Sequence, residues 1–417
     1  MNLIVWRGTK QIGGSCLEVS SATTRIIIDI GEVLPEIGVV KQRPRALPDA
    51  PGLFGKSDRK IDAILVSHGH GDHLGLIDLV DTEIPVFIGE KALKIYNLTA
   101  QFTGRKPIAN PIKYLQSGQG FKVGDFTIVP YLVDHSGFDA YAFLLEQGGK
   151  TLVYTGDFRF HGRKQKATEY FVNSLPDVID VLLIEGTMLS RTQEKVETEE
   201  EIERKAYEFM SSQSRPVLVL QSATNIDRLV GMYRAAKKSG RIFVMDIFTA
   251  HIVSQLNPTI PKPGRFGDIR VFYPYNLTNR MFREPEGQRL MKQFSRHKIL
   301  KEELGTRKDY CMLIRDSMLS DLRYIKNLQG AGLIYSLWSG YKQQDRMSKV
   351  LTFAEKLKME IVDLHTSGHA YLESIAKVIN ITKPKMIVPI HTERPHFFAE
   401  QFEQVYLAED GEEIRIS

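Results

Sequence analysis

From Ile61 onward the first part of the chain repeats one pattern: an apolar run, a polar loop and then an amphipathic stretch. The runs DAILVS, DFTIVPYLV and TLVYTGD are short and rich in branched and aromatic residues, which is typical of strands in a buried sheet. Histidines and carboxylates follow directly after several of these runs. Because strands are rigid and the loops after them can converge, the pattern predicts a functional site at one edge of a sheet.

The pattern changes near residue 195, where the stretch VETEEEIERKAYEFMSS is rich in charge. Ile202, Ala206 and Met210 recur there at helical spacing, which predicts an amphipathic helix. A strand (PVLVLQ), a helix from about Asn225 to Lys238 and a second strand (RIFVMD) come next. This alternation predicts a parallel α/β sheet, separate from the sheets of the first part.

The end of the chain returns to the earlier pattern. The segments KMEIVDLHTSGHA, PKMIVPIHTE and EEIRIS resemble the strands of the first part. We therefore predict that residues 1–195 and 345–417 form one domain, and that residues 196–344 form a second α/β domain inserted into it.

Composition narrows the class of protein. A chain of 417 residues is too long for one ordinary core, and 42% hydrophobic with 25% charged residues is typical of globular proteins. No apolar run approaches the ~18 residues of a membrane-spanning helix, so we expect no membrane association. The two cysteines, Cys16 and Cys311, cannot form a disulfide framework or a cysteine zinc site, and we expect a cytoplasmic protein. The net charge of +5 only weakly favours anionic partners.

The segment SHGHGDHLG places four potential metal ligands within six positions: His68, His70, Asp72 and His73. The glycines between them allow the sharp turns that direct several ligands inward. Imidazole and carboxylate donors without thiolate suit zinc, with manganese or iron as second choices. A lone histidine is usually structural, but four donors at this spacing indicate a metal site.

Three further donors follow predicted strands: His135 in LVDHSG, Asp157 in YTGDFRF and His391 in IVPIHTE. Seven donors are too many for one tetrahedral ion. They suit two ions that share a bridging carboxylate and a bridging hydroxide.

Together these motifs resemble the metallo-β-lactamase fold, an αββα sandwich, in its dinuclear hydrolase form. LLIEGT with Glu185, DLHTSGHA with His369 and VPIHTE with His391 further resemble the motifs of the β-CASP nucleases, which carry an inserted α/β domain. Within that family the chain resembles bacterial RNase J, and the resemblance covers nearly the whole chain. It implies a zinc-dependent hydrolase that cleaves RNA phosphodiester bonds with a hydroxide shared by two metals.

The resemblance also implies a role for each site residue. One ion is held by His68, His70 and His135, the other by Asp72, His73 and His391, with Asp157 between them. The proposed catalytic set is Asp72, His369 and Glu185. In it His369 contacts the scissile phosphate and protonates the leaving oxygen, while Glu185 orients that imidazole. The alternatives are a structural His369 and a Glu185 that pairs with a basic residue.

Several weaker signals stay open. Asp29 resembles the aspartate that braces the ligand loop, and it also suits a simple turn. Ser367 and Gly368 suit either phosphate binding or an ordinary turn. The basic stretch 279–308 suits RNA contact or a solvated helix face, and Trp338 and Tyr341 suit base stacking or packing at the domain boundary.

Two other functions explain part of the sequence. A small-molecule ester, thioester or lactone hydrolase of the same superfamily uses the same donors, but leaves the insert and His369 unexplained. A nucleic-acid-binding β-CASP protein without catalysis is disfavoured by the intact ligand set. The usual phosphate loop of RNase J is replaced by YSLWSGYKQQD, so a 5′-end preference is not carried over. Endonuclease or exonuclease mode and the oligomeric state also stay open, with a homodimer as one candidate.

Overall fold

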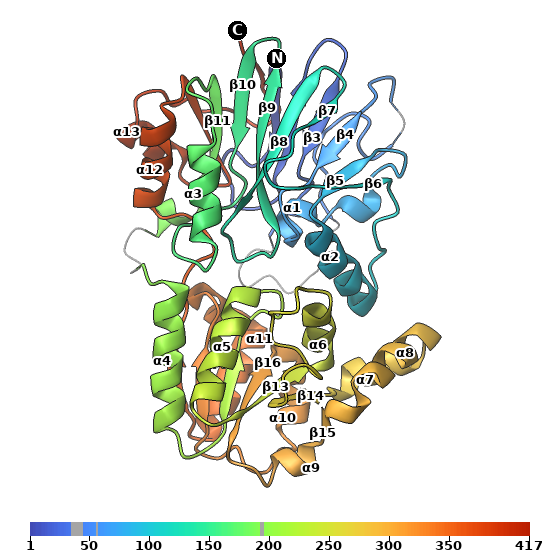
Figure 1. The fold of residues 1–417 in the computed structure, drawn as a ribbon, viewed down its shortest axis with the longest axis vertical. Coiled ribbons are helices and arrows are strands. Elements are labelled where there is room, and N and C mark those ends of the chain that lie inside the picture. The colour runs from blue at the N-terminus through green and yellow to red at the C-terminus, as the bar shows by residue number, and fades with distance from the viewer. Residues whose placement is uncertain (35–44, 56, 192–195) are drawn as a thin grey trace.

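Two sheets packed face to face form the upper domain in Figure 1. The computed structural model describes residues 1–34, 45–55, 57–191 and 196–417. The strands of the first sheet are, in spatial order, β20 (Glu413–Arg415), β1 (Asn2–Arg7), β2 (Cys16–Ser20), β3 (Arg25–Ile28), β4 (Ala63–Leu65), β5 (Val86–Ile88) and β6 (Ile112–Tyr114). Those of the second are β19 (Met386–Ile390), β11 (Val181–Glu185), β10 (Lys150–Tyr154), β9 (Ala140–Gln147), β8 (Phe126–Val133) and β7 (Phe121–Val123).

The alternation of side chains along these strands divides them between two cores. In β3, Ile26 and Ile28 face the core between the sheets, whereas Ile27 faces the outer core under the helices. The outer helices are α1 (Gly71–Leu74) and α2 (Glu90–Thr103) on the first sheet, and α3 (Gln165–Asn173), α12 (Leu372–Thr382) and α13 (Pro395–Gln401) on the second. The predicted αββα sandwich is therefore confirmed.

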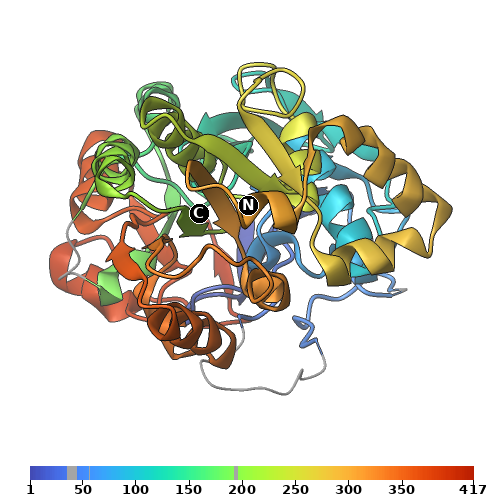
Figure 2. The same ribbon diagram turned by 90° about the horizontal axis from the view of Figure 1, so that it is seen from below.

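A third sheet, parallel throughout, forms the lower domain in Figure 1. Its strands are, in order, β15 (Lys298–Ile299), β14 (Ile269–Phe272), β13 (Ile242–Asp246), β16 (Tyr310–Ile314), β12 (Val217–Leu220), β17 (Gly332–Tyr335) and β18 (Glu360–Asp363). The helices of this domain are α4 (Glu199–Ser212), α5 (Ile226–Lys238), α6 (Ile247–Ser254), α7 (Tyr275–Phe282), α8 (Pro285–Gln293), α9 (Lys301–Leu304), α10 (Leu319–Leu322) and α11 (Asp345–Lys356). Separate cores on the two faces of the sheet show that helices cover both sides (Figure 2).

One strand that we predicted for the first domain lies in the insert. The segment KMEIVD forms β18, which pairs in parallel with β17 at the edge of the third sheet. Val350 and Ala354 of α11 and Met359 before β18 belong to the core of that domain. We therefore propose that the insert ends after Asp363, beyond the predicted boundary at residue 344. The other predicted boundary, at 195, lies at the end of a segment outside the described residues.

The chain returns to the first domain at its end. Segments from the two ends of the sequence lie together in the upper part of Figure 1, and β20 pairs antiparallel with β1, where Arg415 is opposite Asn2. In the part of the chain that the structure describes, no helix is both long and apolar enough to cross a membrane.

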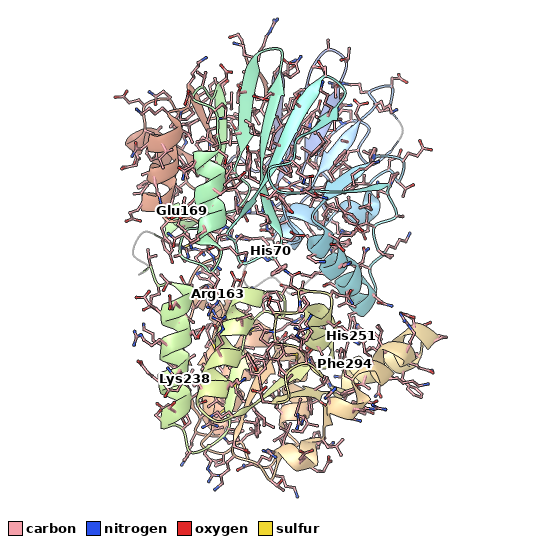
Figure 3. The ribbon with its side chains drawn as sticks, viewed as in Figure 1. His70, Arg163, Glu169, Lys238, His251 and Phe294 are labelled. Carbon is pink, nitrogen blue, oxygen red and sulfur yellow. The ribbon has the colours of Figure 1, made fainter. Side chains whose placement is uncertain are left out.

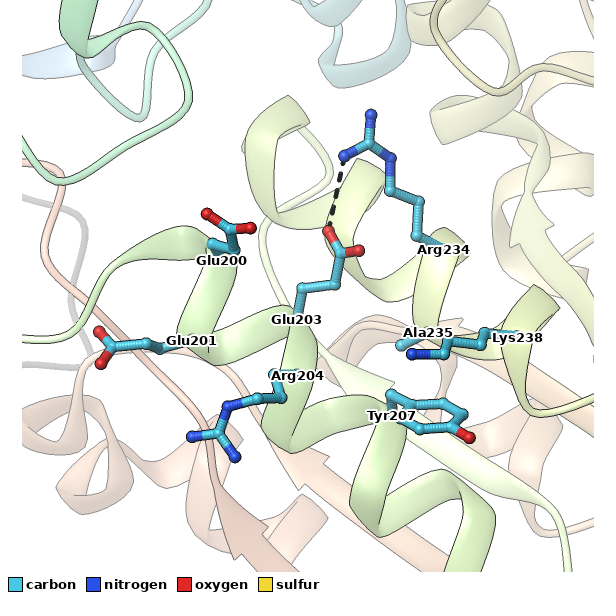
Figure 4. A pocket seen from close by; sticks show the side chains of 8 residues that line it. All are labelled: Glu200, Glu201, Glu203, Arg204, Tyr207, Arg234, Ala235 and Lys238. Atoms are coloured by element: carbon cyan, nitrogen blue, oxygen red, sulfur yellow. Dashed lines mark ion pairs between the residues drawn. The ribbon is translucent and has the colours of Figure 1, made fainter.

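The predicted charge-rich helix is α4, which starts with a capping box between Thr198 and Glu201. It packs against α5, and the two leave a groove on the outer surface of the insert (Figure 4). Several charged side chains in this groove contact other side chains of the protein. Glu203 lies 3.7 Å from Arg234, and the ammonium of Lys238 lies 4.2 Å from the ring centre of Tyr207. We assign no site to this groove.

A buried network of charges joins the two domains. Arg159, after β10, is fully buried and contacts Asp134 of the first domain at 3.1 Å. It also contacts Glu199 and Asp227 of the insert at 3.1 and 3.0 Å. Arg228 of α5 binds the other side of the Glu199 carboxylate at 2.9 Å. Glu199 therefore joins two buried guanidinium groups, one from each domain.

We predict that Glu199→Gln destabilises the protein strongly, because it leaves two buried guanidinium groups without their shared counter-charge. The expected loss is about 3–5 kcal/mol. Urea unfolding followed by circular dichroism measures it, with Glu200→Gln as control because Glu200 is the exposed neighbour on the same helix turn. Equal unfolding midpoints for the two variants would contradict the role of the network.

Candidate metal centre

The predicted ligands converge where the two domains meet. His68 to His73 follow β4, His135 follows β8, Asp157 follows β10 and His391 follows β19. These strands end at the edge of the sandwich that faces the insert, and His70 lies at this junction (Figure 3). Among the described residues, four groups of side chains have ligand atoms within 4.8 Å of one another. Two of them match the sets implied by the resemblance: His68 with His70 and His135, and Asp72 with His73 and His391. The other two join Asp157 to His68 and His73, and to Glu185, His369 and His391.

In the first group, hydrogen bonds fix which nitrogen faces the centre. Nδ1 of His135 lies 2.6 Å from the carbonyl oxygen of Gly368, so it carries the proton and donates. Its Nε2 therefore presents a lone pair, 3.2 Å from Nδ1 of His70. Burial lowers the pKa of His68 and of His135, which keeps both imidazoles neutral. Neutral imidazoles are the form that binds metal ions.

The second group is supported in the same way. Nδ1 of His391 lies 2.8 Å from Oγ1 of Thr187, and that hydroxyl donates in turn to the carbonyl oxygen of His391 at 3.3 Å. The imidazole therefore donates from Nδ1 and directs Nε2 toward Asp72, whose Oδ2 lies 3.4 Å away. His391 has a φ of 52°, an uncommon backbone conformation for a residue other than glycine.

Asp157 lies between the two groups. Its Oδ2 is 3.1 Å from Nε2 of His73 and 3.7 Å from Nε2 of His68, and its Oδ1 is 3.9 Å from Nδ1 of His391. The residue is only 2% exposed, yet neither carboxylate oxygen has a hydrogen-bond partner among the described residues. Burial alone would raise the pKa of Asp157, but His391 and His73 outweigh it and hold that pKa well below its ordinary value.

This arrangement requires a cation. Nε2 of His73 and of His68 also have no hydrogen-bond partner among the described residues. Burial lowers the pKa of His73, but the carboxylates of Asp157 and Asp29 outweigh it and raise that pKa. A buried carboxylate facing imidazole nitrogens is stable only with positive charge between them, supplied by protons or by metal ions. The donor set therefore fits a metal centre.

Asp29 supports the ligand loop. Its Oδ2 accepts from Nδ1 of His73 at 2.7 Å, from Oγ of Ser67 at 2.7 Å and from the hydroxyl of Tyr154 at 2.5 Å. Its Oδ1 accepts from the backbone N–H of Ser67. The Ser67 hydroxyl then accepts from Nδ1 of His68 at 3.1 Å. One carboxylate thereby orients two ligands, which agrees with a bracing role rather than a simple turn.

His369 lies beside the centre and is held by Glu185. Oε2 of Glu185 is 3.0 Å from Nδ1 of His369, and Oε1 accepts from the backbone N–H of Phe158 at 2.9 Å. Burial lowers the pKa of His369, but the charges of Glu185 and Asp157 outweigh it and raise that pKa to about 9. The imidazole therefore carries a proton at neutral pH, and its side chain is 20% exposed.

Sequence reasoning missed several supporting residues. Thr187 and Tyr154 lie inside the quoted motifs LLIEGT and TLVYTGD, but a hydroxyl at a strand end has no signal of its own. The carbonyl of Ser367 accepts from Arg159 at 2.9 Å, and Nε2 of His161 lies 2.8 Å from it. The hydroxyl of Ser367 accepts from the backbone N–H of His369. This loop is thus held by the protein itself, and His161 supports it.

The structure also gives the surroundings of the remaining candidate residues. In the basic stretch 279–308, Arg289 pairs with Glu286 at 2.5 Å and Phe294 is buried, whereas Phe282 is exposed. The ring of Trp338 packs edge to face on Tyr341 and carries the guanidinium of Arg191 at 3.8 Å. His251 is buried, and its Nε2 lies 3.0 Å from the carbonyl oxygen of Leu290. It is therefore separate from the donor cluster.

Comparison with known proteins defines the class. Residues 24–209 match the model of the beta-lactamase superfamily domain, and residues 355–417 match that of the Zn-dependent metallo-hydrolase RNA specificity domain. A protein of unknown function from Enterococcus faecalis V583 has the same fold, with a TM-score of 0.82, 21% identity and 99% coverage of both chains. The chain therefore contains a domain of the beta-lactamase superfamily.

Within that superfamily the chain is similar over most of its length to proteins named ribonuclease J. It is 21% identical to Ribonuclease J of Helicobacter pylori (strain ATCC 700392 / 26695) across 98% of this chain. The chain spans 60% of the length of that relative. It is 23% identical to an RNase J-like protein of Methanocaldococcus jannaschii, with 93% of this chain and 91% of the relative covered.

We predict that Asp29→Asn weakens metal binding by about 10- to 100-fold, the range for loss of a group that orients a ligand. Asparagine tolerates the φ of 60° at this position, so the change tests charge rather than backbone strain. Competition with a chelator measures zinc affinity. Asp125→Asn, at an exposed aspartate far from the centre, is the control. Wild-type zinc affinity in a folded Asp29→Asn protein would show that Asp29 does not support the ligands.

Proposed function

We propose that this protein is a ribonuclease that hydrolyses RNA phosphodiester bonds and that its resident cofactors are two zinc ions, with manganese as an alternative. The observation that carries the proposal is Asp157, a buried carboxylate without hydrogen-bond partners among the described residues, which lies between two groups of imidazole and carboxylate donors. His68, His70 and His135 would hold one ion, and Asp72, His73 and His391 the other, with Asp157 between them. When bound, such ions supply a water of lowered pKa and positive charge that faces a phosphate.

His369 supplies a proton donor, which the metal ligands do not. Its Nδ1 is engaged with Glu185, so Nε2 is the nitrogen free to donate a proton. A departing 3′ oxygen needs a proton, and a positioned imidazolium beside the centre can give it. Glu185 holds the ring in place and stabilises its charged form. It is therefore a positioning residue in this proposal, whereas His369 is catalytic.

Two observations favour RNA over a small ester. The model that matches residues 355–417 is described as an RNA specificity domain, and this segment contains both His369 and His391. The donors also lie at the junction with a second domain, where Figure 3 labels His70, and this gives a polymer a surface on both sides of the centre. Hydrolysis of a small ester, thioester or lactone would use the same donors without needing His369 or the insert. The intact donor set disfavours a binding protein without catalysis.

The experiment that tests the proposal is digestion of an end-labelled single-stranded RNA by purified protein of measured zinc content. We expect cleavage that is lost on chelation and restored by zinc. A ladder of fragments would assign an endonuclease, and mononucleotides would assign an exonuclease. Turnover of a small ester together with no action on RNA would overturn the proposal.

In the same assay we expect His369→Ala to keep the wild-type metal content and RNA affinity but to lose about 10²- to 10⁴-fold in cleavage rate, the range for a lost general acid. An RNA whose scissile bond has a much better leaving group should recover part of that loss. His396→Ala, at an exposed histidine of α13, is the matched control. Loss of zinc from His369→Ala would make His369 a ligand, and an unchanged rate would make it structural.

A further inference from the structure

A pocket of about 350 Å³ opens beside the first group of metal ligands. One wall is the ligand loop itself, Gly69 to Gly71, which includes His70. The opposite wall is a face of α2, and Phe138 and Thr224 close the side toward the insert. The volume is at the low end of the range for small-molecule sites, about 300–1,000 Å³. It suits one ring system rather than a folded segment of polymer.

The face of α2 that lines the pocket combines apolar side chains with hydroxyl groups. Ile95, Tyr96, Thr99, Ala100 and Thr103 are spaced three and four positions apart and form one stripe along the helix. Alanine and threonine leave the space that bulkier residues would fill. Tyr96 and Ala100 of this stripe also belong to the core under the first sheet, and Ile95 belongs to the core of the insert. The stripe lines the pocket beside the ligand loop.

Two hydroxyls in this wall lack partners. The hydroxyl of Tyr96 and Oγ1 of Thr99 are buried, and neither has a hydrogen-bond partner among the described residues. Tyr96 is only 8% exposed. Burial raises the pKa of Tyr96 to about 12, so its hydroxyl stays protonated and can donate. A buried hydroxyl without a partner costs free energy, and a ligand with polar atoms at its edge would remove that cost.

The charges at the rim indicate that the ligand group is neutral. Arg105 pairs with Glu32 at 2.9 Å and also donates to the carbonyl of Gly75 at 3.3 Å. These are the charged side chains among the described residues that line the pocket, apart from the imidazole of His70. A phosphate would find no unpaired cation here. A planar, uncharged group with donors and acceptors fits the walls better.

We propose that this pocket binds one unpaired nucleobase of the substrate strand, from the nucleotide next to the phosphate that is cleaved. The inference rests on the proposed function for the identity of the strand. The hydroxyls of Tyr96 and Thr99 bond the polar edge of the base, and Phe138 contacts its ring. Bases of single-stranded RNA are recognised in this way, by contact with aromatic rings and by hydrogen bonds to their edges.

The test uses an RNA oligonucleotide with a single abasic residue placed in turn at each position around the scissile bond. For the wild type, we expect kcat/KM to fall at one position by about 10- to 100-fold, the range for a lost group in a fitted pocket. Thr99→Leu fills the pocket. We expect the kcat/KM of this variant on intact RNA to fall by a similar factor. The abasic residue should not lower its kcat/KM further. Lys94→Leu, on the same helix but outside the pocket, is the control.

A second variant and a second measurement distinguish failure of the pocket assignment from failure of the proposed function. Tyr96→Phe removes one hydroxyl. We expect its kcat/KM on intact RNA to be about 2- to 12-fold lower, which corresponds to one hydrogen bond. Calorimetry with uridine 5′-monophosphate and with adenosine 5′-monophosphate measures binding without cleavage. If the wild type cleaves no RNA, the proposed function fails. The pocket assignment still stands if nucleotide binding is present in the wild type and lost in Thr99→Leu. It is overturned if Thr99→Leu keeps the abasic penalty or binds nucleotide like the wild type.

Discussion

The other donors of the centre surround the buried carboxylate of Asp157. A negative charge that is 2% exposed and has no hydrogen-bond partner among the described residues cannot persist without cations beside it. The histidines around it are not free to turn toward other partners. The carboxylate of Asp29, the hydroxyl of Thr187 and the carbonyl of Gly368 each engage one ring nitrogen and leave the other for the centre. The fold thereby prepares a place for metal.

The second domain contacts the loop that carries His369. Arg159 of the first domain holds the carbonyl of Ser367, and Arg228 of the insert lies 3.2 and 3.3 Å from the carbonyls of Leu364 and Thr366. Glu199 binds both guanidinium groups. The segment between the insert and His369 is therefore held from both domains at once.

Much of the fold and of the metal centre could be predicted from the sequence because its signals are local. HGHGDH and strands that end in histidine or aspartate place their donors by spacing alone. The edge strand β18 was assigned to the wrong domain because an edge strand reads alike in any sheet, and only its pairing with β17 decides. Contacts between distant residues, such as Arg159 with Glu199 or Tyr154 with Asp29, have no local pattern. Nor does the pocket that contains Tyr96, because it forms only when α2 lies against the ligand loop.

We propose that one chain holds two metal ions, one on either side of Asp157. Anomalous X-ray diffraction from crystals of zinc-loaded protein, measured above and below the zinc absorption edge, locates such ions. We expect two anomalous peaks, one among His68, His70 and His135 and the other among Asp72, His73 and His391. A single peak, or a peak bound by Glu185 and His369 in place of either group, would contradict it.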